Sequence, residues 1–282
     1  MGAWAKIRVQ IALGAGLVSM LMSAHATAGV DVNQVKAKGK LAVATEALYE
    51  PFEFVKDGKI VGYGRDILDE IGKDWNVKIE QADLPFGGIL TGLLQKKYDL
   101  VATTMIINPE RVTKYAFTMP IAVTRVAALK KKGDTKVKSL DDLTGLTVGA
   151  IVPPAGPTAV LEKLNAKLTE QGKGAAKIVH FQSDPDMVLA LANGQIDVAI
   201  ENQLPLNTIV QKQPTKFEIV GTTGDPFFIG WALRPDDTAL RDAINAEIKR
   251  LRDSGLLAEF QKKWFGFTMT IPDSGYMPPG AI

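Results

Sequence analysis

Cysteine is absent from the 282 residues of this chain. Disulfide bonds, thiolate metal sites and a cysteine nucleophile are therefore excluded. Histidine is almost as scarce, with only His25 and His180. His25 falls in a segment that we expect to be removed, and a single remaining histidine excludes a metal site built from several histidines. A Ser-His-Asp triad would have to use His180.

No stretch of the chain reaches the ~20 apolar residues that a membrane span needs. The most apolar run, residues 9–22, follows the basic residues Lys6 and Arg8 and precedes small residues in A-x-A order. This order is typical of a secretory signal peptide, which we assign to residues 1–28. No cysteine follows it, so a lipid-anchored lipoprotein is not expected. The signal peptide predicts a free protein in the periplasm.

An excess of charge of one sign is also missing. The chain has 33 basic and 31 acidic residues, and removal of the signal peptide with Lys6 and Arg8 leaves 31 of each. A neutral chain argues against nucleic acid as a partner. Phosphate loops and G-x-S-x-G elbows are absent, and Gly62 and Gly64 form only half of a dinucleotide fingerprint because the third position is Ile67. These absences favour binding over catalysis.

Strand and helix patterns alternate in two blocks, about residues 40–103 and 126–225. Apolar residues at helical spacing mark the helices, and short apolar runs mark the strands. Such alternation is typical of parallel α/β sheets. A tail rich in proline and glycine ends the chain and reads as a loose extension. We expect a loop at 46–54, helices at 65–75 and 87–95, and two final helices at 237–253 and 256–264.

Short segments in a characteristic order extend over nearly the whole mature chain. They include Tyr49-Glu50-Pro51-Phe52-Glu53-Phe54, Lys97-Tyr98-Asp99-Leu100-Val101, Asn108-Pro109-Glu110-Arg111, Asn193-Gly194-Gln195-Ile196-Asp197 and Lys262-Lys263-Trp264-Phe265-Gly266. From about Gly39 to Gly266 the chain resembles the periplasmic solute-binding proteins of ABC importers. Within them it resembles the amino-acid-binding (family 3) group of the type II periplasmic binding fold.

The resemblance implies an α/β protein of two lobes, joined by two hinge strands, with the ligand cleft between them. Lobe 1 would comprise residues 39–121 plus 235–267, and lobe 2 would comprise 126–226. The hinge strands would cross near 122–125 and 227–234, and residues 268–282 would form a C-terminal extension.

The implied function is binding without catalysis, cofactor or metal. A monomer would capture a small carboxylate-bearing, amino-acid-like solute by closure of its lobes and deliver it to the transmembrane subunits of an ABC permease.

Arg111 matches the arginine with which the family binds a ligand carboxylate. A guanidinium offers a two-pronged contact to such a group. Thr103 and Thr104 end an apolar strand, and in the family hydroxyls at this place bond the same carboxylate. Tyr49 and Phe86 match aromatic positions that stack on the ligand.

Glu46 falls where the family often has an acidic residue, and it would pair with a ligand cation. Thr158 would substitute for a threonine that the family places at a helix start, although here Pro153 and Pro154 interrupt the pattern. Trp231 either lines the cleft or packs in a core.

Two residues depart from the amino-acid-binding pattern. Asn202 stands where the family places an aspartate for the ligand ammonium, and Ile106 stands where it usually has a hydroxyl residue. A buried ammonium needs a counter-charge. Either Glu46, Glu50 or Glu201 supplies it, or the ligand lacks a typical α-ammonium. We expect a ligand that is not a standard α-amino acid bound in the usual manner.

The alternative function is an enzyme on the same fold, such as a periplasmic dehydratase that acts on a cyclic carboxylate. This enzyme would need a poised general acid. The candidates are Glu46, Glu50, Glu201 and His180.

Overall fold

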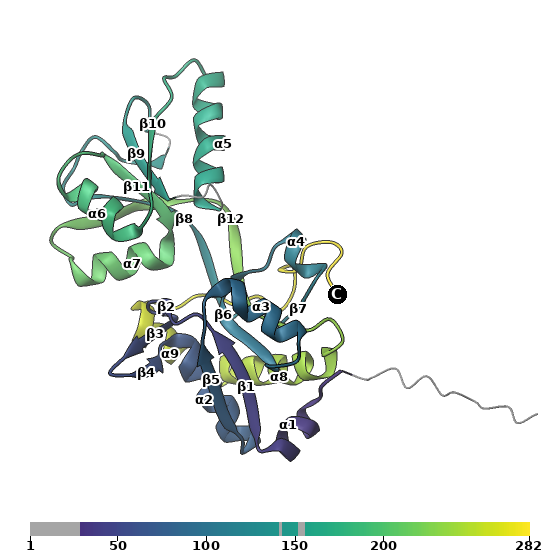
Figure 1. Ribbon diagram of the computed structural model, residues 1–282. Helices are drawn as coiled ribbons and strands as arrows, with labels where there is room; N and C mark the ends of the chain where they lie inside the picture. The colour runs from purple at the N-terminus through teal and green to yellow at the C-terminus, as the bar shows by residue number, and fades with distance from the viewer. Residues whose placement is uncertain (1–28, 141–142, 152–155) are drawn as a thin grey trace, which may run out of the picture.

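The computed structural model describes residues 29–140, 143–151 and 156–282. The predicted signal peptide at 1–28, together with Pro153 and Pro154, lies outside these ranges. Within them no helix is long and apolar enough to cross a membrane. Figure 1 shows two bodies joined by two long strands, which we call lobe 1 (the body that carries both ends of the described chain) and lobe 2.

The described residues form a nine-stranded sheet that continues through both lobes. In spatial order its strands are β10 (Lys177–Phe181), β9 (Thr147–Ile151), β11 (Val198–Asn202), β8 (Ala122–Lys131), β12 (Phe217–Leu233), β6 (Leu100–Ile106), β1 (Lys40–Thr45) and β5 (Lys78–Asp83), and β7 (Ala116–Phe117) pairs with β12. Parallel pairs form in lobe 1, where β1 lies between β5 and β6, and in lobe 2, where β9 lies between β10 and β11. The alternation in the sequence predicted these parallel pairs.

Helices flank the sheet in both lobes, as Figure 1 shows. Helix α2 illustrates why, because Ile67, Leu68 and Ile71 recur at helical spacing and are fully buried. Together with residues of the last two helices they form the largest apolar core of lobe 1. The helices of lobe 1 are α1 (Val32–Lys38), α2 (Tyr63–Trp75), α3 (Phe86–Leu94), α4 (Pro109–Val112), α8 (Thr238–Asp253) and α9 (Leu256–Phe265), and those of lobe 2 are α5 (Pro157–Glu170), α6 (Asp184–Ala192) and α7 (Gln203–Lys212).

The segment expected as a loop at 46–54 contributes four of its nine residues to a second, smaller sheet. It consists of β2 (Leu48–Tyr49), β3 (Glu53–Lys56) and β4 (Lys59–Val61). Asp57 and Gly58 both have positive φ, at 52° and 73°, which is the backbone of a tight two-residue hairpin turn. The loop expectation was therefore wrong for Leu48, Tyr49, Glu53 and Phe54.

Strands β8 and β12 form the connection between the lobes. They pair antiparallel, and the register shifts between Thr223 and Phe227. Gly224, inside this irregular stretch, has a φ of 74° that a residue with a side chain rarely adopts. This register shift adjoins the crossings of the hinge strands expected near 122–125 and 227–234. The residue boundaries proposed above for the lobes remain a prediction.

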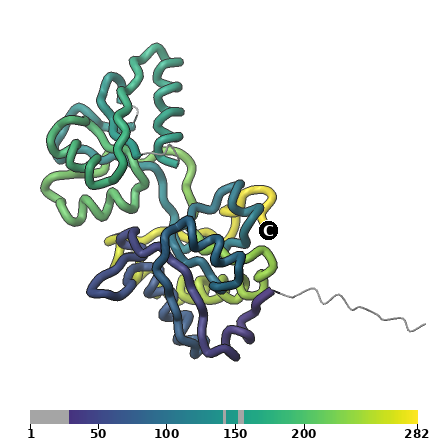
Figure 2. Tube along the Cα trace, viewed as in Figure 1, coloured from purple at the N-terminus to yellow at the C-terminus, as the bar shows by residue number. Residues whose placement is uncertain are grey.

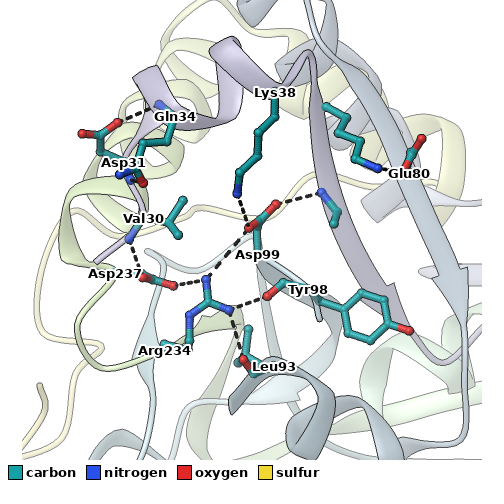
Figure 3. Close-up of polar contacts among 12 residues, drawn as sticks. Val30, Asp31, Gln34, Lys38, Glu80, Leu93, Tyr98, Asp99, Arg234 and Asp237 are labelled. Carbon is teal, nitrogen blue, oxygen red and sulfur yellow. Dashed lines mark hydrogen bonds and ion pairs between the residues drawn. The ribbon is translucent and has the colours of Figure 1, made fainter. Parts of the chain in front are cut away.

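A buried ion cluster closes the discontinuous lobe 1 (Figure 3). The Arg234 guanidinium, on the chain returning from β12, lies 2.6 Å from an Asp237 carboxylate oxygen and 4.0 Å from one of Asp99. It also donates hydrogen bonds to the carbonyl oxygens of Leu93 and Tyr98. Asp237 accepts the backbone N–H of Val30 at 2.7 Å, so the cluster links three segments that are distant in sequence.

The C-terminal tail is docked on lobe 1 and is not loose. Ile271 is buried, and the Tyr276 ring meets Phe228 edge-on with centroids 6.3 Å apart. The backbone N–H of Ile282 donates to the carbonyl oxygen of Val112 at 3.1 Å. Figure 2 shows the yellow tail following lobe 1 to its end. Apolar residues spaced along the tail explain the docking, which proline and glycine content alone did not predict.

Candidate functional site

Two adjoining cavities lie in the cleft between the lobes, with volumes of about 170 and 470 Å³. Both are lined by Tyr49, Ile106 and Asn202, so these three residues lie where the two cavities meet. The first is also lined by Glu46, Phe86, Thr103, Thr104, Leu204 and Pro205, and the second by Thr158, Gln182, Ser183, Asp184 and Glu201.

The sheet topology explains why these residues meet. The parallel strands β1 and β6 of lobe 1 end at Thr45 and Ile106, and the parallel strands β9 and β11 of lobe 2 end at Ile151 and Asn202. Carboxyl ends of parallel strands are the usual place of ligand sites in open α/β sheets. Here the cavities are lined by residues at or near the carboxyl ends of parallel strands from both lobes.

The wall from lobe 1 is fixed by its own hydrogen bonds. The Glu46 carboxylate accepts the backbone N–H of Phe86 at 3.0 Å, and the Thr103 hydroxyl accepts the backbone N–H of Glu46 at 3.3 Å. These bonds hold the loop after β1 against the start of α3. Phe86 is the first residue of that helix, which places its ring at the cavity.

Behind this wall lies Glu53, which is fully buried. The Thr104 hydroxyl donates to Glu53 Oε2 at 3.0 Å, whereas Oε1 has no hydrogen-bond partner among the described residues. Burial raises the pKa of Glu53 to about 8. A Cβ on Gly64 would come within 2.4 Å of Oε1, so a glycine at this position makes room for the carboxyl group.

The wall from lobe 2 is acidic. Glu201, with 9% of its surface exposed, accepts both the backbone N–H and the side-chain Nδ2 of Asn202, at 2.7 and 2.8 Å. Burial, with a contribution from the charge of Asp184, raises the pKa of Glu201 to about 7. Burial also raises the pKa of Asp184. The hydroxyl of Tyr49, from lobe 1, has its pKa raised by burial and then by the charges of Glu201 and Asp184.

Arg111 lies beside the cavities on α4. Its guanidinium donates to the carbonyl oxygen of Ile106 at 3.1 Å and lies 5.7 Å from the centre of the Phe86 ring. Both of these neighbours line the first cavity. Partial burial lowers the pKa of Arg111. No ion pair of Arg111 within 4.0 Å occurs in the described part of the chain, so its charge is not neutralised there.

Residues 41–267 match the family model of the bacterial extracellular solute-binding proteins, family 3. The chain belongs to this family. The L-cystine-binding protein TcyJ of Escherichia coli (strain K12) is 29% identical over 92% of this chain and 94% of its own length. The arginine-binding extracellular protein ArtP of Bacillus subtilis (strain 168) is 28% identical over 81% of this chain and 87% of its own.

Among solved structures, an ancestral arginine-binding protein bound to arginine superposes on the solute-binding protein with a TM-score of 0.61. It is 29% identical and covers 81% of this chain and 99% of its own. The two-lobed α/β fold predicted from the sequence is confirmed, as is membership of the family. The relatives are binding proteins, and the chain is a solute-binding protein rather than the enzyme considered as the alternative.

Most of the predicted ligand-binding residues of the solute-binding protein come together. Glu46, Tyr49, Phe86, Thr103, Thr104, Thr158 and Asn202 line the cavities, whereas Arg111 does not. The Thr158 hydroxyl donates to the carbonyl oxygen of Ile151 at 2.9 Å, which ties the start of α5 to β9. The ligand contacts of all eight remain predictions.

Other candidates lie elsewhere. Glu50 is exposed and pairs with Lys212 of lobe 2 at 2.8 Å. Trp231 is fully buried in the core of lobe 1, and His180 is exposed on β10. In the described ranges no three histidine, aspartate or glutamate side chains gather as a metal site would require.

Sequence reasoning missed Glu53 and Asp184 as residues of the site. The signal for Asp184 was available, because it starts a helix directly after a strand. No pattern pointed to the burial of Glu53, since β3 is too short to show a clear alternation.

Proposed function

We propose that this protein is the periplasmic receptor of an ABC importer for an amino acid. The lobes close around the ligand in the cleft, and the closed form delivers it to the transmembrane permease. The observation that supports this most is the cleft itself. On the lobe 1 side lies the Arg111 guanidinium, which has no ion-pair partner among the described residues. On the lobe 2 side the cleft is lined by the buried carboxyl group of Glu201 and the half-buried one of Asp184.

A ligand with a carboxylate at one end and a cationic nitrogen at the other fits that polarity. The cystine and arginine named for the two relatives both have this chemistry. Of the two alternatives that Asn202 left open, the position of Glu201 favours a counter-charge within the cleft over a ligand without an ammonium group. We therefore no longer expect a ligand outside the amino acids.

A thermal-shift screen of the twenty standard amino acids and L-cystine tests the proposal. We expect stabilisation by one or a few of them, with micromolar or tighter affinity by calorimetry. Stabilisation by none of these compounds would contradict the proposed function. Mass spectrometry that detects conversion of a bound amino acid into a product would instead support the enzyme alternative.

Closure of the lobes should be visible in solution. The lobes are connected through β8 and β12, and the irregular stretch around Gly224 gives this connection a place to bend. We expect the radius of gyration from small-angle X-ray scattering to decrease when the ligand found in the screen saturates the protein. A profile that stays unchanged at saturation would count against the closure mechanism.

Substitution of Arg111 by lysine should weaken binding by about 1.5–3 kcal/mol, because an ammonium cannot make the two-pronged contact of a guanidinium. Isothermal titration calorimetry of Arg111→Lys with the ligand from the screen measures this. Arg250→Lys, an exposed arginine on α8, is the matched control and should bind as wild type does. Equal affinity of Arg111→Lys and wild type would remove Arg111 from the site.

A further inference from the structure

The amide of Asn202 is held in one orientation by its neighbour. Its backbone N–H and its Nδ2 both donate to the same oxygen of Glu201, at 2.7 and 2.8 Å. This oxygen already accepts the backbone N–H, and in the structure the nitrogen end of the amide faces it as a second donor. The other end, Oδ1, is therefore turned away from Glu201.

Oδ1 of Asn202 is a buried acceptor without a hydrogen-bond partner in the part of the chain that the structure describes. Buried acceptors are almost always satisfied in folded proteins, and one that is not calls for a donor from outside the chain. Asn202 is one of the residues that line both cavities of the cleft. A ligand bound in the cleft can supply such a donor.

Two carboxyl groups lie close to this acceptor, and neither is paired with a cation in the part of the chain that the structure describes. Glu201 is 9% exposed, and Asp184 at the start of α6 lines the same cavity. Neither carboxylate has an ion-pair partner within 4.0 Å among the described residues. The titratable group that faces them from lobe 1 is the Tyr49 hydroxyl, which carries no positive charge. A cationic group entering the cleft would relieve this imbalance.

We infer that Glu201 is a positioning residue that orients and polarises Asn202, so that Asn202 Oδ1 accepts an N–H from a cationic nitrogen of the ligand. The pair thus performs the task of a single carboxylate: Asn202 makes the contact and Glu201 holds the charge one residue away. This inference rests on the proposed function, since it assigns the cationic end of the amino acid. The raised pKa of Glu201 agrees with it, because a buried carboxylate without a cation retains its proton more strongly.

Two substitutions of equal shape separate the charge from the geometry. Glu201→Gln keeps an acceptor oxygen for the Asn202 amide and removes only the charge. Asn202→Asp adds a charge at the contact atom itself, and the double variant Glu201→Gln/Asn202→Asp moves the charge from the positioning residue to the contact residue. Glu162→Gln, an exposed residue on α5 of the same lobe, is the matched control.

Affinities are measured by calorimetry with L-cystine and L-arginine, and with 3,3′-dithiodipropionate, which keeps the carboxylates of cystine but has no ammonium. Glu201→Gln should bind the tighter of the two amino acids about 10- to 100-fold more weakly than wild type, which is the range of a charge-assisted hydrogen bond. The double variant should recover to within a few-fold of wild type. Glu162→Gln should equal wild type. Any affinity for 3,3′-dithiodipropionate should change by less than a few-fold in Glu201→Gln.

Recovery in the double variant distinguishes a role in charge from a role in folding, because a purely structural defect of Glu201→Gln would not be repaired by a second substitution. A Glu201→Gln variant with wild-type affinity, or a double variant as weak as Glu201→Gln, would overturn the inference and leave the proposed function intact. A wild-type protein that binds neither amino acid would overturn both.

Discussion

Substitution of Arg234 by methionine is expected to lower the free energy of unfolding by about 3–5 kcal/mol, the usual cost of removing one partner from a buried ion pair. Asp237, at 2.6 Å from the guanidinium, would keep a buried charge without its cation. The carbonyl oxygens of Leu93 and Tyr98 would also lose a donor. Urea denaturation of the Arg234→Met variant measures the change.

The matched control is Lys40→Met. Lys40 pairs with Glu80 at 2.9 Å on the surface, and an exposed pair of this kind contributes little to stability. The Arg234 cluster lies near the amino ends of β1 and β6, whereas the cleft lies at their carboxyl ends. The folded fraction of Arg234→Met should therefore bind ligand as wild type does. A loss of stability no larger than that of Lys40→Met would show that the cluster does not hold lobe 1 together.

Long periodic segments made most of the fold predictable from the sequence. The helix expected at 65–75 is Tyr63–Trp75, and that expected at 237–253 is Thr238–Asp253. Their apolar faces are long enough to define both the period and the buried side. The strands of the small sheet are two to four residues long, too short to show a period, and only the structure reveals them.

The candidate site was predictable where it follows from strand ends and family positions. Asn202 ends β11 as expected, Thr103 and Thr104 lie inside β6 because that strand continues to Ile106, and all three residues line the cavities. The network that couples Asn202 to Glu201 was not predictable, because adjacent residues in an extended strand normally point to opposite faces. Here β11 ends at Asn202, and the bond of Glu201 to the backbone N–H of Asn202 brings the two side chains together at that end.

Substitution of Glu53 by glutamine is expected to remove a large part of the pH dependence of stability. The folded-state pKa of Glu53 is raised to about 8 because burial removes the carboxyl group from water, whereas the ordinary value is 4.5. Between these values the folded protein retains a proton that the unfolded chain has lost. Stability therefore falls as pH rises from about 4.5 to 8, and it is constant with respect to Glu53 outside this window. At about 1.4 kcal/mol per pKa unit, the loss reaches an upper limit of about 5 kcal/mol.

Glutamine has the shape of the protonated carboxyl group and keeps an oxygen that accepts the Thr104 hydroxyl hydrogen, so Glu53→Gln should fold as wild type does at pH 5. Urea denaturation is carried out at pH 5, 6.5 and 8.5. As pH rises, the free energy of unfolding of Glu53→Gln should increase relative to that of wild type by several kcal/mol. Glu259→Gln, an exposed glutamate on α9, is the control and should follow the wild-type curve. Glu201 and Asp184 remain in every variant, so their titration cancels from the comparison. Parallel curves for Glu53→Gln and wild type would mean that Glu53 is ionised in the folded protein, with a cation or water meeting Oε1.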